Sequence, residues 1–257
     1  EMVELHDKLL EEDGLAPLIA LAMGNDLNTK GEACRALANL AANRDVQQQI
    51  MTQGGLRPMV NGVRNNNIAC QRFGALGIGN LATNVANQVR IVQEGAIQPL
   101  VQLSGDMSAD TEARRYSVLA LANLAATIGN HPAILEEKAL FSLFTLSNSP
   151  DILSQYYVAY ALANLAANER NHLHIVQEGG LQPCISLAYS PDPDVHHQGT
   201  ELDRTGQNWT LLLAGYLPVP PSTKHTTALI PLLVFFWFSF GFLSACSVFS
   251  RCSFDFL

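Results

Sequence analysis

An eight-residue block recurs along the chain at a nearly constant interval. Ala-Leu-Ala-Asn-Leu-Ala-Ala-Asn occupies residues 36–43 and again residues 161–168, and close variants occupy residues 78–84 and 121–127. The central asparagines are separated by 41, 43 and 41 residues: Asn39, Asn80, Asn123 and Asn164. Self-similarity with a period of about 40–47 residues is typical of helical solenoids. The sequence therefore predicts a stack of similar helical units, each of which buries its apolar face only against its neighbours.

A second repeated mark precedes each asparagine block. In the second unit it reads Gly54-Gly55-Leu56-Arg57-Pro58. Glycine supplies the left-handed or open backbone that ends one helix, and proline is tolerated in the first turn of the next. In the fourth unit, at residues 136–141, both the glycine and the proline are lost. The apolar residue of the mark keeps spacings of 41, 41, 43 and 41 residues: Leu15, Leu56, Ile97, Leu140 and Leu181.

Each unit is predicted to hold three helices. A short first helix precedes the mark, a second helix follows it, and a long third helix carries the asparagine. Thr205 stands where a fifth asparagine is due, so the last unit is incomplete. The predicted first helices are 46–52, 87–93 and 172–177, and the second helices are 56–63, 97–103, 140–146 and 181–188. The predicted units lie near residues 1–43, 44–84, 85–127 and 128–168, with a partial unit at 169–198.

The composition changes after residue 198. Residues 199–225 are linker-like, and residues 226–250 hold no charged side chain in 25 positions. That length and apolarity meet the criterion for a transmembrane helix, which needs roughly 20 residues. Two interpretations stay open: a C-terminal membrane anchor, or unpatterned sequence that follows a misplaced splice junction. Residues 251–257 form the C-terminal end.

The net charge argues against a nucleic-acid partner. The segment after residue 198 has three acidic and three basic residues, so residues 1–198 hold 20 acids, 12 bases and the whole net charge of −8. Affinity for phosphates comes mostly from clustered Lys and Arg. The five cysteines form no CxxC pair, a pattern that favours reduced thiols and a cytoplasmic location.

Enzyme-like groups of residues are weak in this sequence. Gly74, Gly77 and Gly79 are interpreted as helix-packing glycines, because no strand-turn-helix context for a phosphate loop surrounds them. No nucleophile elbow is present. One further group matches no structural zinc spacing and is better explained as a loop that caps a helix: Asp192, Asp194, His196 and His197. We therefore expect no catalytic residue, no cofactor and no metal site.

The Gly-Gly-Leu-x-Pro mark, the three helices per unit and the Leu-x-Asn-Leu-Ala block together resemble the armadillo repeat family. The resemblance covers residues 1–198, and it is greatest to the branch of vacuolar protein 8 and beta-catenin. It implies an all-α fold, a right-handed superhelical solenoid of about four and a half repeats with a divergent C-terminal tail. It also implies a cytoplasmic place, at a vacuolar-type membrane surface. The family's nuclear-import adaptors carry Trp four residues before the asparagine, and here those positions are Arg35, Leu76, Leu119 and Tyr160.

The repeated asparagine has two candidate roles. Its side chain matches the donor and acceptor of a peptide bond, and the resemblance implies that Asn39, Asn80, Asn123 and Asn164 line a concave groove and hold an extended partner. The alternative is that each asparagine bonds the backbone of the neighbouring repeat and serves packing alone. Four further residues are expected on the same face, because they lie four or eight positions before an asparagine: Arg35, Tyr160, Arg72 and Arg115.

The expected function is a non-enzymatic scaffold that binds extended segments of partner proteins. Cationic and aromatic residues beside the asparagines predict partner side chains that are acidic or apolar. One alternative is a membrane tether anchored through residues 226–250. Another is the repeat part of a larger multidomain enzyme, such as a ubiquitin ligase with an upstream catalytic module.

Overall fold

The computed structural model describes residues 12–205, and these residues contain fourteen α-helices, two short 3-10 helices and no β-strand. The all-helical solenoid predicted from the repeats is confirmed. Contacts divide the chain after Gly206, and the second unit, residues 207–257, lies outside the described range. The segment 226–250, the C-terminal end and residues 206–225 of the predicted linker therefore lie outside it as well, whereas linker residues 199–205 belong to α15.

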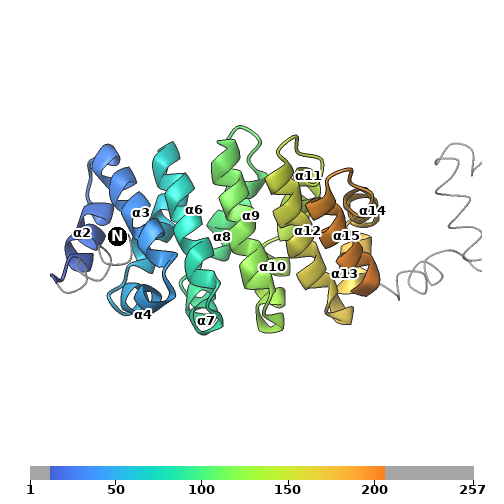
Figure 1. The fold of residues 1–257 in the computed structure, drawn as a ribbon, viewed down its shortest axis with the longest axis horizontal. Helices are drawn as coiled ribbons and strands as arrows, with labels where there is room; N and C mark the ends of the chain where they lie inside the picture. The colour runs from blue at the N-terminus through green and yellow to red at the C-terminus, as the bar shows by residue number, and fades with distance from the viewer. Residues whose placement is uncertain (1–11, 206–257) are drawn as a thin grey trace, which may run out of the picture. The chain divides into compact units, whose positions relative to one another are not determined.

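The long third helices lie side by side in Figure 1 and form one row of the solenoid. The first four begin after Asp26, Asn67, Asp110 or Asp151, whose side chain accepts a hydrogen bond from the backbone N–H three residues later. Such caps satisfy one of the unpaired N–H groups at a helix start. The third helices are α3 (Leu27–Ala41), α6 (Ile68–Ala82), α9 (Thr111–Ala125), α12 (Ile152–Ala166) and α15 (Pro193–Thr205).

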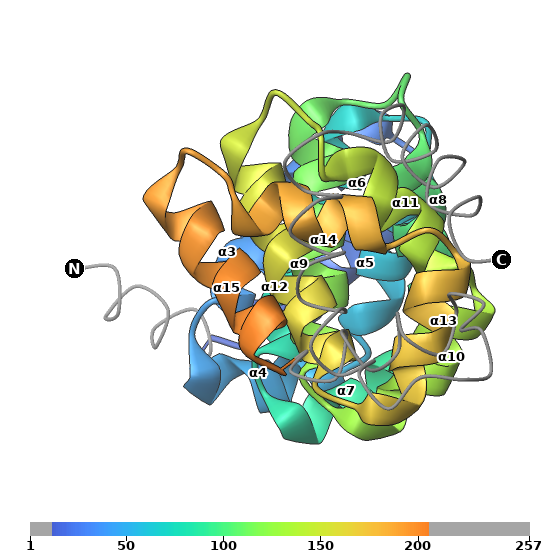
Figure 2. The same cartoon turned by 90° about the vertical axis from the view of Figure 1, so that its right-hand side faces the viewer.

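The first and second helices form the other two rows, which Figure 2 shows beside the row of third helices. Apolar residues from all three rows meet between them, and the leucine that follows each repeated asparagine is at most 5% exposed. The first helices are α4 (Arg44–Thr52), α7 (Val85–Gln93), α10 (His131–Glu136) and α13 (His172–Gln177). The second helices are α2 (Leu15–Met23), α5 (Leu56–Val63), α8 (Ile97–Gly105), α11 (Ala139–Leu146) and α14 (Leu181–Ala188).

The glycine mark behaves as the sequence predicts. Gly54, Gly95 and Gly179 have φ angles of +83°, +71° and +86°, values that glycine adopts without a steric cost. The fourth unit lacks this glycine, yet the turn is kept, because Lys138 itself adopts φ 59°. The repeat geometry therefore imposes the left-handed turn even on a residue that disfavours it.

Buried polar side chains close the C-terminal ends of the third helices. The residue eight positions after each repeated asparagine is Gln47, Gln88, His131 or His172, and all four are buried. Each donates a hydrogen bond to the carbonyl of Ala41, Ala82, Ala125 or Ala166, the last residue of the preceding third helix. Helix ends leave such carbonyls unpaired, so these side chains satisfy them inside the protein.

The same side chains connect successive repeats. Gln88 donates to the backbone carbonyl of Asn123 at 3.0 Å and accepts from Asn130 Nδ2 at 3.1 Å. His131 Nε2 lies 2.8 Å from the Ala125 carbonyl, which only accepts, so this nitrogen is the donor. His131 Nδ1 then accepts from Asn171 Nδ2 at 2.8 Å. Glutamine and histidine thus make equivalent bonds at equivalent repeat positions.

The fifth unit forms a third helix without the asparagine block. α15 packs on α12 and α14 and continues to Thr205, beyond residue 198. Gly199 lies where its added Cβ would meet Leu187 and Ala188 backbone atoms at 2.5–2.6 Å. Gly74 occupies the equivalent position in the second unit and approaches α5 in the same way. The fifth unit therefore keeps the close helix contact of the repeat although it has lost the asparagine.

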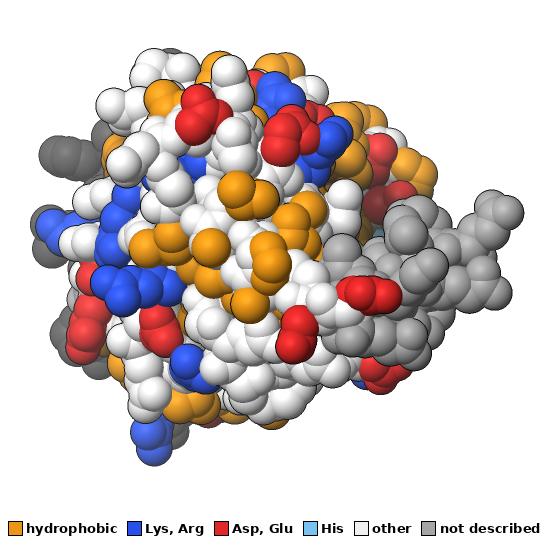
Figure 3. Space-filling view, turned by 90° about the vertical axis from the view of Figure 1, so that its left-hand side faces the viewer, with side chains coloured by type: hydrophobic (Ala, Val, Ile, Leu, Met, Phe, Trp, Pro, Cys, Tyr) orange, Lys and Arg blue, Asp and Glu red, His pale blue; other side chains and the backbone are white. Residues whose placement is uncertain are grey.

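The end of the described solenoid that carries α2 exposes hydrophobic side chains, which gather near the centre of the view in Figure 3. In this first repeat Leu21, Met23 and Leu27 are 47%, 42% and 47% exposed. A terminal repeat has a neighbour on one side only, so only one of its two stacking faces is buried.

Within residues 12–205, no single helix is long and apolar enough to cross a membrane. A pair of helical segments in this range, Thr111–Ala125 and Ile128–Glu136, is together long and apolar enough, but it is bent by 116° at the break between them.

Candidate functional site

The repeated asparagines lie on the third helices and link them to one another. Asn80, Asn123 and Asn164 each donate from Nδ2 to a backbone carbonyl of the preceding third helix, at 2.9–3.0 Å. The three acceptors are equivalent, because each is the residue just before the preceding asparagine: Ala38, Gly79 and Ala122. The packing role considered for asparagine is therefore present in the structure.

The backbone explains why these carbonyls need a partner. At the ends of α3, α6 and α9 the cap N–H bonds to the asparagine carbonyl three residues earlier, which leaves the carbonyl one residue further back without its usual helical N–H. The asparagine of the next repeat donates a hydrogen bond to that carbonyl. At the end of α12 no fifth asparagine follows, and there Ala167 N–H bonds to Ala163 O in the ordinary α-helical way.

Each interhelical bond uses one N–H of the asparagine amide. The second N–H and the Oδ1 atom of Asn80, Asn123 and Asn164 have no hydrogen bond to any residue in the described range, and all three side chains are half-buried. Asn39 is exposed, and its side chain makes no hydrogen bond among residues 12–205. A peptide group needs one donor and one acceptor, so the amides keep the atoms that such a group would bond.

The three predicted arginines all form ion pairs with carboxylates of this chain. Arg35 pairs with Glu32 on its own helix. Arg72 bonds Asp110 through two nitrogens at 2.6 Å and also reaches Glu112 at 2.7 Å. Arg115 bonds Asp151 through two nitrogens at 2.8 Å. Two-point pairs of this kind have a defined geometry, and here they tie α6 to α9 and α9 to α12.

Both carboxylates in the two-point pairs also cap a helix. Asp110 accepts from Ala113 N, and Asp151 accepts from Ser154 N. The hydrogen bond from Arg72 lowers the pKa of Asp110. Burial raises the pKa of Asp151, but the hydrogen bonds from Arg115 and Ser154 outweigh that effect and leave it lowered.

A pH experiment tests these ion pairs. Carboxylates with lowered pKa contribute stability that is complete above their ordinary pKa of about 3.9 and is lost as the pH falls through the lowered value. Replacing Asp110 and Asp151 together by Asn is expected to reduce stability at pH 7 and to flatten its loss between about pH 5 and 2. The caps survive, because Asn67 caps α6 through its amide oxygen. Urea midpoints at pH 7 and pH 3 would measure this, and an unchanged pH dependence would contradict the assignment.

Residues seven positions before the asparagine were not predicted to belong to the site, although they share its face. They are Phe73, Tyr116 and Tyr157, and all three are half-buried. The residues four positions before it are half-buried on the same helices: Leu76, Leu119 and Tyr160. We call these six side chains the apolar stripe. Aromatic residues with spacings of 43 and 41 residues were a signal available in the sequence.

Asp192 and the three glycines of α6, weak candidates for other chemistry, have structural roles in this fold. Asp192 Oδ1 accepts from the N–H groups of Asp194 and Val195 at the start of α15, so it is a helix cap. Gly74, Gly77 and Gly79 are buried within α6, which confirms them as packing glycines. Among residues 12–205 no three His, Cys, Asp or Glu side chains are grouped so that they could hold a metal ion.

Comparisons with known proteins agree with this architecture. Residues 84–126 match the family model of the Armadillo/beta-catenin-like repeat. No curated protein sequence matches the chain. A designed armadillo repeat protein is similar with 26% identity and a TM-score of 0.74, over 79% of this chain and 86% of that one.

Two further similar structures concern peptide recognition. One is described as a computationally designed armadillo repeat protein for modular peptide recognition, with 26% identity and a TM-score of 0.74 over 79% of this chain and 86% of that one. The other was solved with a (KR)4 peptide, with 25% identity and a TM-score of 0.73 over 79% and 85%. The described residues of this chain thus form a solenoid similar to those of designed armadillo repeat proteins, and residues 84–126 also match the family's repeat model.

Proposed function

We propose that the protein is a non-enzymatic scaffold that binds extended segments of partner proteins along the row of third helices. The observation that carries this proposal is that each asparagine amide has one N–H and one oxygen that make no hydrogen bond within the described residues. Asn80, Asn123 and Asn164 use one N–H for packing and keep one N–H and one carbonyl oxygen for a partner. The packing bond also orients the amide, so little conformational entropy remains to be lost on binding.

The spacing of the asparagines suits an extended chain. Packed helix axes are about 8–10 Å apart, and an extended segment advances about 3.3 Å per residue. Each repeat step therefore corresponds to about three residues. The four asparagines would span a segment of about 8–9 residues. Similar designed armadillo proteins are made for peptide recognition, and one is in complex with a peptide, which supports this mode for the fold.

A substitution of the first asparagine, Asn39, distinguishes an effect on peptide binding from an effect on packing. Asn39 makes no side-chain hydrogen bond within residues 12–205, so Asn39→Ala should leave the free energy of unfolding within about 0.5 kcal/mol of wild type. It should nevertheless weaken a bound peptide about 3–10-fold, as expected for one lost hydrogen bond. Asn80→Ala should reduce both quantities, because it also removes the bond to Ala38 O.

The probes for this test are peptides selected on the full chain from a display library of random 12-residue sequences. Their affinities for the variants would be measured by isothermal titration calorimetry, and stability by urea unfolding. Asn66→Ala, in the exposed loop before α6, is the matched control and should change neither. Unchanged affinity in both Asn39→Ala and Asn80→Ala would reject the proposal.

A further inference from the structure

The two arginines on α6 and α9, Arg72 and Arg115, are already paired with carboxylates of this chain. Arg72 already bonds two carboxylates and Arg115 bonds one through two points. An incoming acidic side chain would have to displace Asp110 or Asp151, and both are also helix caps. The partner would gain little binding free energy, because one hydrogen bond between charged groups is exchanged for another. The excess of 20 acids over 12 bases in residues 1–198 adds long-range repulsion.

The carboxylates on the same face are also paired, each with an arginine of this chain. Asp110 and Glu112 face Arg72, and Asp151 faces Arg115. The side chain of Asp151 is only 17% exposed in its pair. A basic partner would therefore also have to break existing two-point pairs over α6, α9 and α12. On this part of the face, over α6, α9 and α12, neither an acidic nor a basic partner side chain would meet an unpaired charge of opposite sign.

Because the charged side chains are paired, the apolar stripe is the surface on these helices that can contact the side chains of a partner. Its members repeat on three successive helices, and α3 carries Glu32 and Arg35 at the same positions. On α12 the aromatic character is strongest, since Tyr156 packs its ring edge against Tyr157 with centroids 5.4 Å apart. On α9 Leu119 reaches the neighbouring helix, where a Cβ added to Gly79 would lie 3.4 Å from Leu119 Cγ. The half-buried side chains thus extend from α6 to α12.

We infer that the apolar stripe selects an extended, uncharged segment whose aromatic or aliphatic side chains face α6, α9 and α12. This inference rests on the proposed function, because the asparagines hold the backbone of the same segment. Alternate side chains of an extended chain point to the same side, so one set meets the stripe while the backbone bonds the amides. Tyr116, Tyr157 and Tyr160 supply aromatic rings, the kind of anchor that dominates many interfaces.

The composition of selected peptides tests the inference. The full chain is immobilised, and a display library of random 12-residue peptides is enriched on it. The enriched peptides should lack net charge and be rich in aromatic and aliphatic residues. Acidic or basic consensus sequences would overturn the inference and leave the proposed function standing. A failure to enrich any peptide would count against both.

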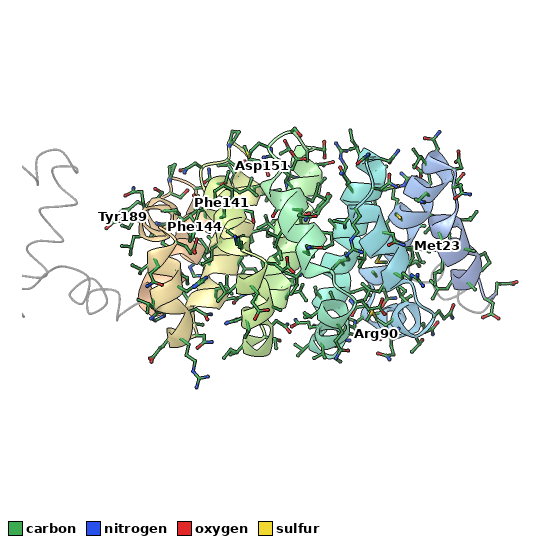
Figure 4. All side chains as sticks on the ribbon, turned by 180° about the vertical axis from the view of Figure 1, so that it is seen from behind. Met23, Arg90, Phe141, Phe144, Asp151 and Tyr189 are labelled. Carbon is green, nitrogen blue, oxygen red and sulfur yellow. The ribbon has the colours of Figure 1, made fainter. Side chains whose placement is uncertain are left out.

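Variants locate the binding surface. Tyr160→Ala and, separately, Tyr116→Ala should weaken the selected neutral peptide about ten-fold or more. The matched control is Phe141→Ala on α11 (Figure 4), an aromatic residue that is 71% exposed outside the third helices. It should leave the affinity unchanged. Circular dichroism confirms that each variant is folded. Unchanged binding in both folded tyrosine variants, or an equal loss in Phe141→Ala, would overturn the assignment to the stripe.

Discussion

Replacing Gly74 by alanine is expected to lower the free energy of unfolding by about 2 kcal/mol or more, although alanine favours helix formation over glycine by about 1 kcal/mol. A Cβ at this position would lie 2.6 Å from Met59 O and 3.0 Å from Val63 N. Both are backbone atoms of α5, so no side-chain rotation relieves the contact. From the other side, a Cβ on Gly62 would lie 2.8 Å from Cys70 O. The whole of α5 would have to move away from α6.

The matched control is Gly129→Ala, because its added Cβ meets only Thr127 Cγ2 at 4.0 Å. This change should leave stability unaltered or slightly improved. Urea unfolding followed by circular dichroism compares the two variants. Equal stability of Gly74→Ala and wild type would mean that α5 and α6 separate at little cost, and the close-contact argument would then be wrong.

His131→Leu is expected to destabilise the protein by about 2–4 kcal/mol, whereas His131→Gln should cost less than about 1 kcal/mol. Leucine would leave the buried Ala125 carbonyl without its donor and would remove the acceptor of Asn171 Nδ2. Glutamine retains both functions, because Gln88 donates to Ala82 O and accepts from Asn130 at the equivalent position.

This pair of variants separates hydrogen bonding from packing. Leucine and glutamine are similar in size, so a cavity alone would not distinguish them. Urea midpoints and thermal unfolding of the full chain measure the difference. If both variants lose the same stability, shape rather than hydrogen bonding decides the position.

Several elements could be predicted from the sequence because their causes are local. The second helices 56–63 and 181–188 were predicted with the bounds that the structure shows, since glycine and proline mark their starts. Lys138 marks the limit of that reasoning. Nothing local favours φ 59° there, and only the helices packed before and after the turn impose it.

The sequence predicted which helical positions the candidate site residues occupy, but not which groups their side chains bond. The repeat placed the asparagines on equivalent helical turns, and helical periodicity placed Arg72 and Arg115 on the same face. The partners of these side chains come from other repeats, 36–44 residues away in sequence. No spacing within one helix reveals that Asp110 and Asp151 neutralise the arginines, and the prediction of a cationic face did not include them.

The sequence by itself determined the helical repeat, the turn at each glycine and the face on which each asparagine lies, because these follow from backbone preferences within one unit. The tertiary structure alone decided which amide atoms, guanidinium groups and rings remain for a partner. Hydrogen bonds and ion pairs between repeats compete for the same groups that would bind a ligand. The outcome depends on distances between neighbouring helices, which exist only after the units have stacked.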